Sequence, residues 1–237
     1  MIPIYCLTSN ITKHIVSIFV TLFNKYWPNQ EVTILGYDKL EYNLPNNFSF
    51  ISLGQEPENQ YWTNGLIPYF TKMENKYFII VLDDFFLINY MDQNKLKYLF
   101  DITQKYNADK AMLHMCLNKS HDKEIEKDII LIGEEREYKT TLHPAIWKKD
   151  MWLYYLQPNL TAWQFEWQNQ TGKTDNFKIF SIKGQQKYAV SLEDKHLYNC
   201  INYYRERKVN MNSDGIKAII NQEDLEDSLF KLTKLVL

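Results

Sequence analysis

Two adjacent carboxylates follow the most apolar segment of the chain. Lys76–Leu82 is nearly continuous in apolar residues, and Asp83 and Asp84 come directly after it. Open α/β sheets place their ligands at the carboxyl ends of strands, and hard divalent cations prefer carboxylate oxygens. Adjacent side chains of a regular strand point to opposite faces, so both acids can reach one ligand only where the strand ends or bulges. The pair indicates either a cation site or the turn that ends a strand.

A third acid lies among aromatic residues. Glu166 is flanked by Trp163, Phe165 and Trp167. An acid in a partly desolvated pocket has a raised pKa, which suits a general base, and aromatic faces stack on sugar rings. The commoner arrangement of such a segment is a helix that faces the core and points its acid to solvent. His143, next to a proline, is a further candidate for orienting a substrate, although a lone histidine more often packs within a structure.

Composition and charge narrow the possible classes of protein. The 237 residues are 45% hydrophobic and 24% charged, which predicts one large folded domain. Lys+Arg 27 against Asp+Glu 29 gives a net charge of −2, without the basic excess that nucleic-acid binding uses. Three widely spaced cysteines are typical of a reducing, cytoplasmic setting. Neither a signal peptide nor an apolar run long enough for a transmembrane segment is expected, so the protein is predicted to be cytoplasmic or peripheral to a membrane.

The first fifty residues predict a strand–helix–strand unit. Ile2–Leu7 has the composition of a strand, and Thr8-Ser9-Asn10 after it are good helix N-caps. Apolar residues then recur at helical spacing over 11–25, and strands are predicted at Glu31–Tyr37 and Phe48–Leu53. Parallel strands joined by a helical crossover place the chain in the α/β class, with a mostly parallel, open mixed sheet covered by helices on both faces.

The rest of the chain continues as one domain, because neither an internal repeat nor a low-complexity linker divides it. We expect a nucleotide-binding half of about 1–117, an acceptor-side half of about 118–210 and a C-terminal helical tail of about 211–237. The further predicted elements are helices at 61–73, 91–106 and 144–156, strands at 76–82, 109–117, 129–132, 140–142 and 177–182, and a surface loop at 118–128.

The order of the motifs is more specific than any one of them. Along the chain lie IYCLTSN, VTILGY, Tyr61-Trp62, YFIIVLDDFFL, LHPAIWKKDMW and AWQFEW. Together, over about residues 1–210, they resemble a small family of GT-A-fold glycosyltransferases from bacterial and viral surface-polysaccharide or lipopolysaccharide loci. The resemblance implies transfer of a sugar from a nucleotide diphospho-sugar donor to a hydroxyl of a glycan or lipid-linked saccharide acceptor.

The resemblance also implies roles at the donor site. Asp83 and Asp84 match the acidic motif that holds a divalent metal, Mn²⁺ or Mg²⁺, on the donor's diphosphate. Thr8 and Ser9 line the nucleotide pocket, together with Asp83 and Trp62. The metal offsets charge on the departing diphosphate. The two acids are adjacent here rather than spaced as D-x-D, which leaves metal dependence open.

On the acceptor side, the resemblance makes Glu166 the base that deprotonates the acceptor hydroxyl. Trp147 and Trp163 shape the sugar site, and His143 contacts substrate. This histidine stands where the family more usually has a glutamine, so a donor or acceptor contact differs at this position.

Three alternatives use the same residues differently. A sugar-nucleotide nucleotidyltransferase relies on a glycine-rich basic loop after the first strand, whereas residues 8–13 contain no glycine. A non-catalytic carbohydrate-binding or assembly protein would bind sugar without binding nucleotide. A two-metal nuclease would need further acids and a basic groove. The sequence also lacks the glycine motifs of P-loop and dinucleotide-binding proteins and the G-x-S-x-G nucleophile elbow.

Overall fold

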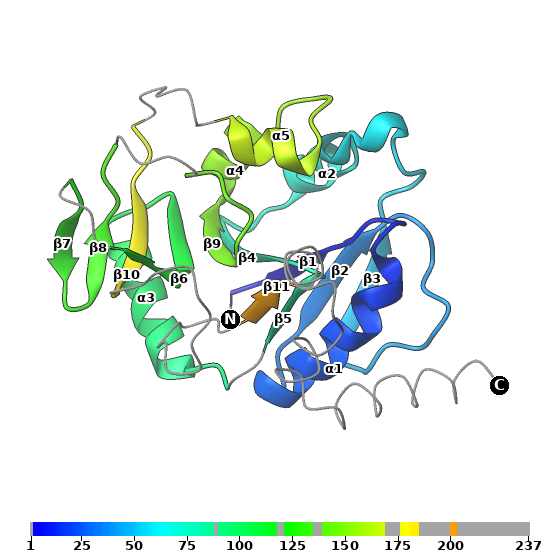
Figure 1. The fold of residues 1–237 in the computed structure, drawn as a ribbon, viewed down its shortest axis with the longest axis horizontal. Helices are drawn as coiled ribbons and strands as arrows, with labels where there is room; N and C mark the ends of the chain where they lie inside the picture. The colour runs from blue at the N-terminus through cyan, green and yellow to red at the C-terminus, as the bar shows by residue number, and fades with distance from the viewer. Residues whose placement is uncertain are drawn as a thin grey trace, which may run out of the picture.

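A nine-stranded sheet crosses the molecule in the order β3-β2-β1-β4-β9-β6-β10-β8-β7 (Figure 1). The computed structural model describes residues 2–87, 90–117, 121–134, 139–168, 176–184 and 200–202. The nine strands are β1 (Ile4–Leu7), β2 (Val32–Gly36), β3 (Phe48–Ser52), β4 (Tyr77–Leu82), β6 (Lys110–Leu117), β7 (Lys123–Glu126), β8 (Ile129–Leu131), β9 (Ala145–Lys148) and β10 (Ile179–Gly184).

Most strands of this sheet run in one direction. The pairs β3–β2, β2–β1, β1–β4 and β6–β10 are parallel. Strand β9 is antiparallel to both of its neighbours, β4 and β6, and β8 is antiparallel to β10 and to β7. Only β9 and β8 therefore oppose the other seven strands of the sheet. This confirms the predicted open, mostly parallel mixed sheet flanked by helices.

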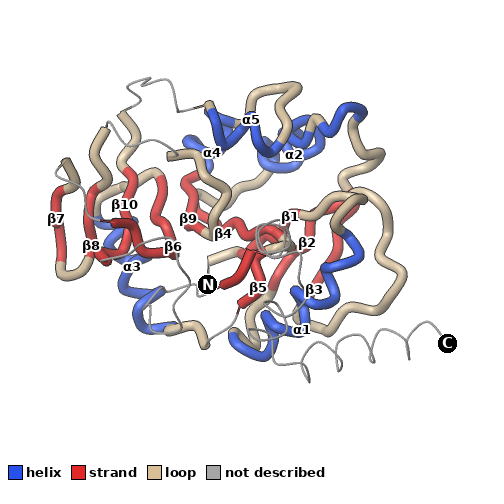
Figure 2. Tube along the Cα trace, viewed as in Figure 1, coloured by secondary structure: helices blue, strands red, loops and turns tan. Residues whose placement is uncertain are grey.

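Helices cover both faces of the sheet (Figures 1 and 2). Helices α1 (Val16–Tyr26) and α3 (Gln93–Lys105) pack on one face. Helices α2 (Trp62–Lys72), α4 (Lys149–Tyr155) and α5 (Ala162–Trp167) pack on the other. The arrangement follows from the nearly continuous apolar strands, which have to bury side chains on both sides.

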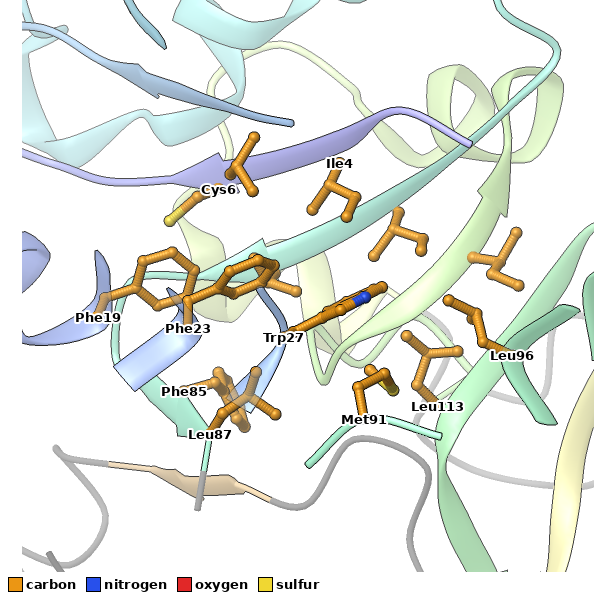
Figure 3. Packing of buried hydrophobic residues seen from close by; sticks show 14 of the residues in the cluster. Ile4, Cys6, Phe19, Phe23, Trp27, Phe85, Leu87, Met91, Leu96 and Leu113 are labelled. Atoms are coloured by element: carbon orange, nitrogen blue, oxygen red, sulfur yellow. The ribbon is translucent and has the colours of Figure 1, made fainter. Parts of the chain in front are cut away.

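Strand β1 shows how the two faces divide. Ile4 and Cys6 belong to the hydrophobic cluster that contains Phe23 of α1, and Figure 3 shows all three in this packing. Tyr5 and Leu7 belong to the cluster on the opposite face. Side chains alternate along a strand, so a strand buried on both faces needs apolar residues at every position. The same holds for β4, the strand predicted to be the most deeply buried, where five of six residues are buried.

Three predicted elements in the second half of the chain were wrong. The segment 140–142 is not a strand, and the loop predicted at 118–128 contains β7. The helix predicted at 144–156 is instead strand β9 followed by helix α4. Ile146 and Trp147 are fully buried in β9, which pairs with β4 on one side and β6 on the other. Long-range pairing thus overrides the local helical spacing.

The first helix also begins later than its predicted caps. A 3-10 turn, Lys13–Ile15, precedes α1, and neither it nor α1 has a side-chain bond from its N-cap residue. Ser9 instead accepts a hydrogen bond from the backbone of Thr12 through its Oγ, at 3.3 Å. The residues predicted to cap the helix therefore belong to the loop after β1.

A short strand, β5 (Phe85–Leu87), pairs with β11 (Cys200–Asn202) as a second, two-stranded sheet that was not predicted. The predicted tail of 211–237 lies outside the described residues. Within the described ranges, no helix combines the length and the apolar character that crossing a membrane requires.

Candidate functional site

The first two candidate residues lie side by side at one edge of the sheet. Strands β1 and β4 are parallel neighbours with Leu7 paired to Leu82, so Thr8 and Asp83 leave the sheet together. Strand β4 ends at Leu82, and Asp83 and Asp84 form the turn that leads into β5. The strand end that both acids need in order to approach one ligand is therefore present.

Asp83 is held by hydroxyl groups. The Thr8 Oγ1 donates a hydrogen bond of 2.6 Å to Asp83 Oδ2. Only 3% of Asp83 is exposed, and burial raises its pKa to about 7, although the hydroxyls of Thr12 and Thr8 act in the opposite direction. Asp84 is more exposed than Asp83. Asp83 thus joins two strands, while Asp84 is the more exposed residue of the pair, although its Oδ1 is buried.

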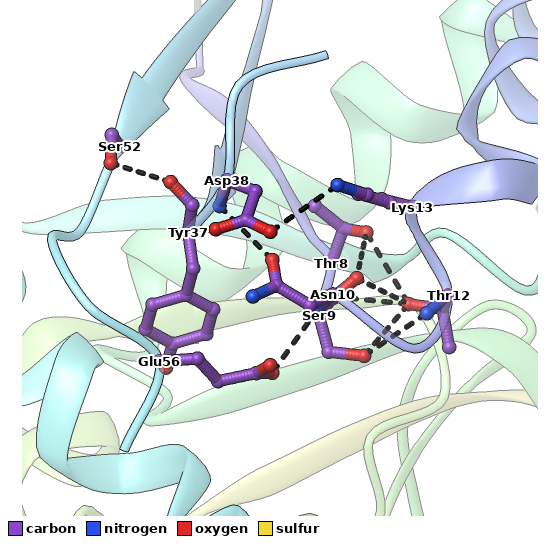
Figure 4. Close-up of polar contacts among 9 residues, drawn as sticks. All are labelled: Thr8, Ser9, Asn10, Thr12, Lys13, Tyr37, Asp38, Ser52 and Glu56. Atoms are coloured by element: carbon purple, nitrogen blue, oxygen red, sulfur yellow. Dashed lines mark hydrogen bonds and ion pairs between the residues drawn. The ribbon is translucent and has the colours of Figure 1, made fainter. Parts of the chain in front are cut away.

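The loop after β1 is held by its own side chains (Figure 4). The Oγ of Ser9 and the Oγ1 of Thr12 lie 3.0 Å apart, and the Ser9 backbone donates to the same Thr12 oxygen at 3.1 Å. Gly36 at the end of β2 allows this loop to lie close, because a Cβ there would stand 2.6 Å from the Thr8 methyl group. The predicted positions of Thr8 and Ser9 at this edge are those of the structure, and their contact with a nucleotide stays a prediction.

Three polar residues that were given no predicted role in a ligand site continue this edge (Figure 4). The Asn10 backbone donates to Glu56 Oε1 at 3.2 Å, and the Asn10 Oδ1 accepts from the Asp38 backbone at 3.0 Å. Lys13 pairs with the Asp38 carboxylate at 3.3 Å. Asn10, Asp38 and Glu56 follow β1, β2 and β3 respectively. Their position just after predicted strands was the signal that could have found them.

Trp62, the first residue of α2, packs on the face of the sheet that α2, α4 and α5 cover. Its ring meets Phe165 edge-on at a centroid distance of 5.4 Å and Trp152 at 6.1 Å. Its backbone carbonyl accepts a 3.4 Å hydrogen bond from the hydroxyl of Tyr37. Burial raises the pKa of Tyr37 to about 12, and the negative charge of Glu56 adds a smaller rise. Trp62 therefore packs against the apolar cluster on this face, and its predicted contact with a nucleotide stays a prediction.

Strand β9 brings His143 to the same edge. Because β9 is antiparallel to β4, with Ala145 paired to Ile80, the segment before β9 lies beside the end of β4. The His143 ring lies 5.0 Å from the ring of Phe85, the residue that follows Asp84. The structure therefore places this histidine next to the acidic turn, although the two are far apart in the sequence.

Glu166 is turned toward the segment before His143 rather than toward solvent. Its Oε1 accepts hydrogen bonds from the Leu142 backbone at 2.5 Å and the Thr141 hydroxyl at 3.2 Å. The Thr140 hydroxyl donates to the Glu166 carbonyl at 2.8 Å. Burial raises the pKa of Glu166, and the bond from Leu142 opposes the rise. A partly buried acid with a raised pKa has the property expected of a general base.

Trp147 does not line a substrate site. It is fully buried, and the Lys110 ammonium lies over its ring at 3.9 Å. Lys110, also fully buried, donates to the carbonyls of Lys139 at 3.0 Å and Thr141 at 2.7 Å. Trp147 was predicted to shape the sugar site, but no part of its side chain is accessible, so it cannot contact a sugar directly. Its role is to pack under the segment that positions Glu166.

Trp163 has the opposite exposure. It is 66% exposed, and Trp167 on the same helix is 55% exposed, whereas Phe165 between them is fully buried. Helix α5 thus packs through Phe165 and leaves both tryptophans accessible. The predicted contact of Trp163 with a sugar stays a prediction.

The acidic turn fits one class of metal site. Among the described residues, no group of three or more His, Cys, Asp or Glu side chains could enclose an ion. Mg²⁺ and similar hard cations often bind one or two carboxylates and take their other oxygens from substrate phosphates and water. A partly exposed Asp84 beside a buried Asp83 fits that pattern and does not fit a site built from protein ligands alone.

No protein-family model matches the chain, and no curated protein matches it significantly in sequence. It is similar in structure to CMP:2-keto-3-deoxy-manno-octonic acid synthetase complexed with CTP, with a TM-score of 0.49 and 12% sequence identity. The match covers 93% of this chain and 98% of the synthetase chain. It is also similar to S. aureus TarS, with a TM-score of 0.47 and 9% sequence identity. This match covers 77% of this chain and 60% of the TarS chain.

A third similar structure is the bifunctional IspDF from Campylobacter jejuni, with a TM-score of 0.45 and 12% sequence identity. This match covers 87% of this chain and 53% of the IspDF chain. The chain therefore spans about half the length of IspDF and 60% of that TarS chain. At TM-scores below 0.5, these likenesses do not decide between reaction classes.

Proposed function

We propose that the protein is a glycosyltransferase that moves a sugar from a nucleotide diphospho-sugar to a hydroxyl of a glycan or lipid-linked saccharide, in the synthesis of a surface glycan. The observation that carries this proposal is the 2.6 Å bond between Thr8 and Asp83, which joins the ends of β1 and β4 and sets the partly exposed Asp84 beside the loop after β1. Ligands of open α/β sheets bind at this edge.

At the donor side, the residues divide into two roles. Asp84 would hold the divalent metal, because it is the more accessible acid, and the buried Asp83 would fix the Thr8 loop. When bound, the metal supplies Lewis-acid stabilisation of charge on the diphosphate. Asp38, whose side chain is 58% exposed, lies where a carboxylate can accept hydrogen bonds from ribose hydroxyls.

At the acceptor side, Glu166 would take the proton of the acceptor hydroxyl. Leu142 and Thr141 fix its Oε1, and Lys110 fixes the segment that carries them. A carboxylate held in this way loses little freedom when it meets the acceptor. The exposed ring of Trp163 offers an apolar face for the acceptor sugar.

The test is thermal unfolding in the presence of UDP, GDP, CDP or dTDP, each with and without Mn²⁺ or Mg²⁺. A ligand at 100 times its Kd adds about 2.7 kcal/mol to the folded state, which raises the Tm of a chain of this size by roughly 5–10 °C. We expect one nucleotide to stabilise the protein, and the rise to depend on metal.

The matched variants are Asp84→Asn and Asp101→Asn. Asp101 lies on α3 with its side chain 51% exposed, so its variant should keep the response that Asp84→Asn loses. Equal responses of the two variants would remove Asp84 from the metal site. If no nucleotide changes the Tm, the glycosyltransferase proposal fails and a carbohydrate-binding protein becomes the better explanation.

A further inference from the structure

A cavity lies at the opposite edge of the sheet from Asp84. Strand β9 runs from Ala145 beside Ile80 to Lys148 beside Tyr77, so it ends where β4 begins. At that end is an open cavity of about 480 Å³, where β6 and β10 also begin. It is lined by side chains of several kinds, among them Asn107, Asp109, Lys148, Tyr154, Asn176 and Phe177.

An ion pair lines one wall of this cavity. Lys148 Nζ and Asp109 Oδ1 are 3.0 Å apart, and each side chain is 12% exposed. The other oxygen of Asp109 accepts a 3.0 Å bond from the backbone of Lys178. An ammonium group has three protons and a carboxylate about four acceptor positions, so both groups have capacity for hydroxyl groups of a ligand.

An aromatic ring forms another wall. Tyr154 is 56% exposed, and its ring is held edge-on by Phe177 at 5.1 Å and by Tyr155 at 5.0 Å. A ring fixed by two aromatic neighbours presents a flat apolar face at little cost in side-chain entropy. An exposed face of this kind suits the C–H side of a sugar ring better than it suits water.

Amide groups complete the chemistry. Asn176 and Asn107 are exposed, and a side-chain amide has two donor protons and one acceptor oxygen. The Asn107 oxygen already accepts bonds from the Lys76 ammonium at 3.1 Å and the Tyr77 hydroxyl at 3.4 Å, so this residue contributes its donor group to the cavity. The charges of Lys148 and Asp109 cancel, which leaves Lys178 as the remaining charge among the lining residues. The lining is therefore close to neutral, and it combines an aromatic face with many hydrogen-bonding groups.

We infer that this cavity binds one saccharide unit of a glycan chain, with the sugar ring stacked on Tyr154 and its hydroxyls bonded to the Lys148–Asp109 pair and Asn176. This site is separate from the acidic turn, and its occupation needs neither a nucleotide nor a metal. It goes beyond the proposed transfer reaction, since a glycan held here contacts the opposite edge of the sheet from the residues that would react.

Saturation-transfer difference NMR tests the inference with free glucose, galactose, mannose, rhamnose and N-acetylglucosamine at millimolar concentration. We expect at least one sugar to bind the parent protein. Tyr154→Ala should weaken that binding by at least about tenfold, as loss of an aromatic contact at the centre of a site does. Tyr154→Phe keeps the ring and should retain binding.

Two further variants locate the site. Tyr98→Ala removes a 39% exposed tyrosine on α3 and should leave binding unchanged. If Tyr154→Ala does not fold, Asn176→Ala carries the test, because that side chain is exposed. Binding of no sugar, or binding that Tyr154→Ala leaves unchanged, would overturn the inference.

The outcome is independent of the proposed reaction. Asp84→Asn should keep sugar binding at this cavity even where it loses the response to nucleotide. Sugar binding that depends on Tyr154, together with no response to any nucleotide, would reject the glycosyltransferase proposal and support the second site.

Discussion

The two edges of the central sheet each hold a largely buried aspartate, and they stabilise it differently. Asp83 receives a hydrogen bond from the neutral hydroxyl of Thr8, and burial raises its pKa to about 7. Asp109 is paired with the ammonium of Lys148 and also bonded by a backbone amide. A hydroxyl satisfies a hydrogen-bond acceptor without offsetting its charge, whereas an ammonium does both.

This difference indicates which ligand suits each edge. At the edge that contains Asp83 and Asp84, a cation would stabilise two carboxylates that lie next to each other. At the edge that contains Asp109, the charge is already offset, so a neutral ligand rich in hydroxyls fits better than an ion.

The largest effect is expected at Glu166. Glu166→Gln keeps an oxygen that can accept the bond from Leu142 but removes the base, so transfer should fall by about 10²- to 10⁴-fold. Binding of the nucleotide should stay within about threefold, because this change acts on the chemical step. Initial rates and nucleotide titrations measure the two quantities. Glu74→Gln, on an exposed loop residue, is the control, and retained turnover in Glu166→Gln would exclude the residue from the mechanism.

The ion pair at the opposite edge should matter most for stability. Lys148→Met leaves the Asp109 carboxylate without its cation and should lower the free energy of unfolding by about 3–5 kcal/mol. Lys183→Met breaks an exposed pair with Glu124 and should cost less than about 1 kcal/mol. Urea unfolding measures both, and adding Asp109→Asn to Lys148→Met should recover part of the loss. Equal losses in the two single variants would show that the Lys148 pair is no stronger than a surface contact.

Asp83 should make the protein less stable as the pH rises, because its negative charge is not offset by a cation. Its folded pKa of about 7 lies above its ordinary value of 3.8, so its stabilising effect is complete below the ordinary value and is lost as the pH rises through about 7. Asp83→Asn accepts the same bond from Thr8 without charge. Relative to this variant, the free energy of unfolding of the parent protein should fall by on the order of 2–4 kcal/mol between about pH 4 and about pH 8, because one pKa unit corresponds to about 1.36 kcal/mol.

Urea unfolding across that pH range measures the difference for Asp83. The exposed Asp101→Asn provides the control and should show no comparable change. A difference between parent and Asp83→Asn that does not vary with pH would mean that the buried carboxylate is compensated as well as Asp109 is, and the contrast between the edges would be lost.

The smallest effect is expected at Gly36. An alanine Cβ there would lie 2.6 Å from the Thr8 methyl group and 2.9 Å from the Phe50 ring, so Gly36→Ala should cost about 1–2 kcal/mol. Thr8→Ser removes the methyl group and keeps the hydroxyl that bonds Asp83. The double variant should therefore recover stability, as thermal unfolding would show. Without such recovery, contact with Thr8 is not the reason for glycine at this position.

The first half of the fold was predictable because its signals are local. The β1–α1–β2 unit and the strand that ends at Leu82 follow from apolar spacing and from turn residues such as Asn46. The acidic turn could be found in the same way, because Asp83 and Asp84 stand at the end of the most apolar strand. Strand β9 could not, since Ile146 and Trp147 fit a helical pattern equally well and only pairing with two distant strands decides between them.

The candidate site shows the same difference between local signals, which the sequence reveals, and long-range contacts, which it does not. Thr8 and Asp83 could be placed from their positions after strands, but the bond between them depends on two strands 75 residues apart lying next to each other. Trp147 was misjudged because its aromatic type fits a sugar site and a core equally well, and its burial is set by the helices above it. Asp38 and Glu56 carry no composition signal beyond their places after strands.

Strand β9 has a consequence for how the chain is made. Strands β4 and β6 are close in sequence, yet neither bonds the other, and each pairs along one side with β9. Until Ala145–Lys148 has been synthesised, that side of both strands has no partner, and unpaired edges of apolar strands are prone to join other chains. A chain truncated before Ala145 would therefore aggregate, and a nascent chain on the ribosome would benefit from a chaperone until that short segment has emerged.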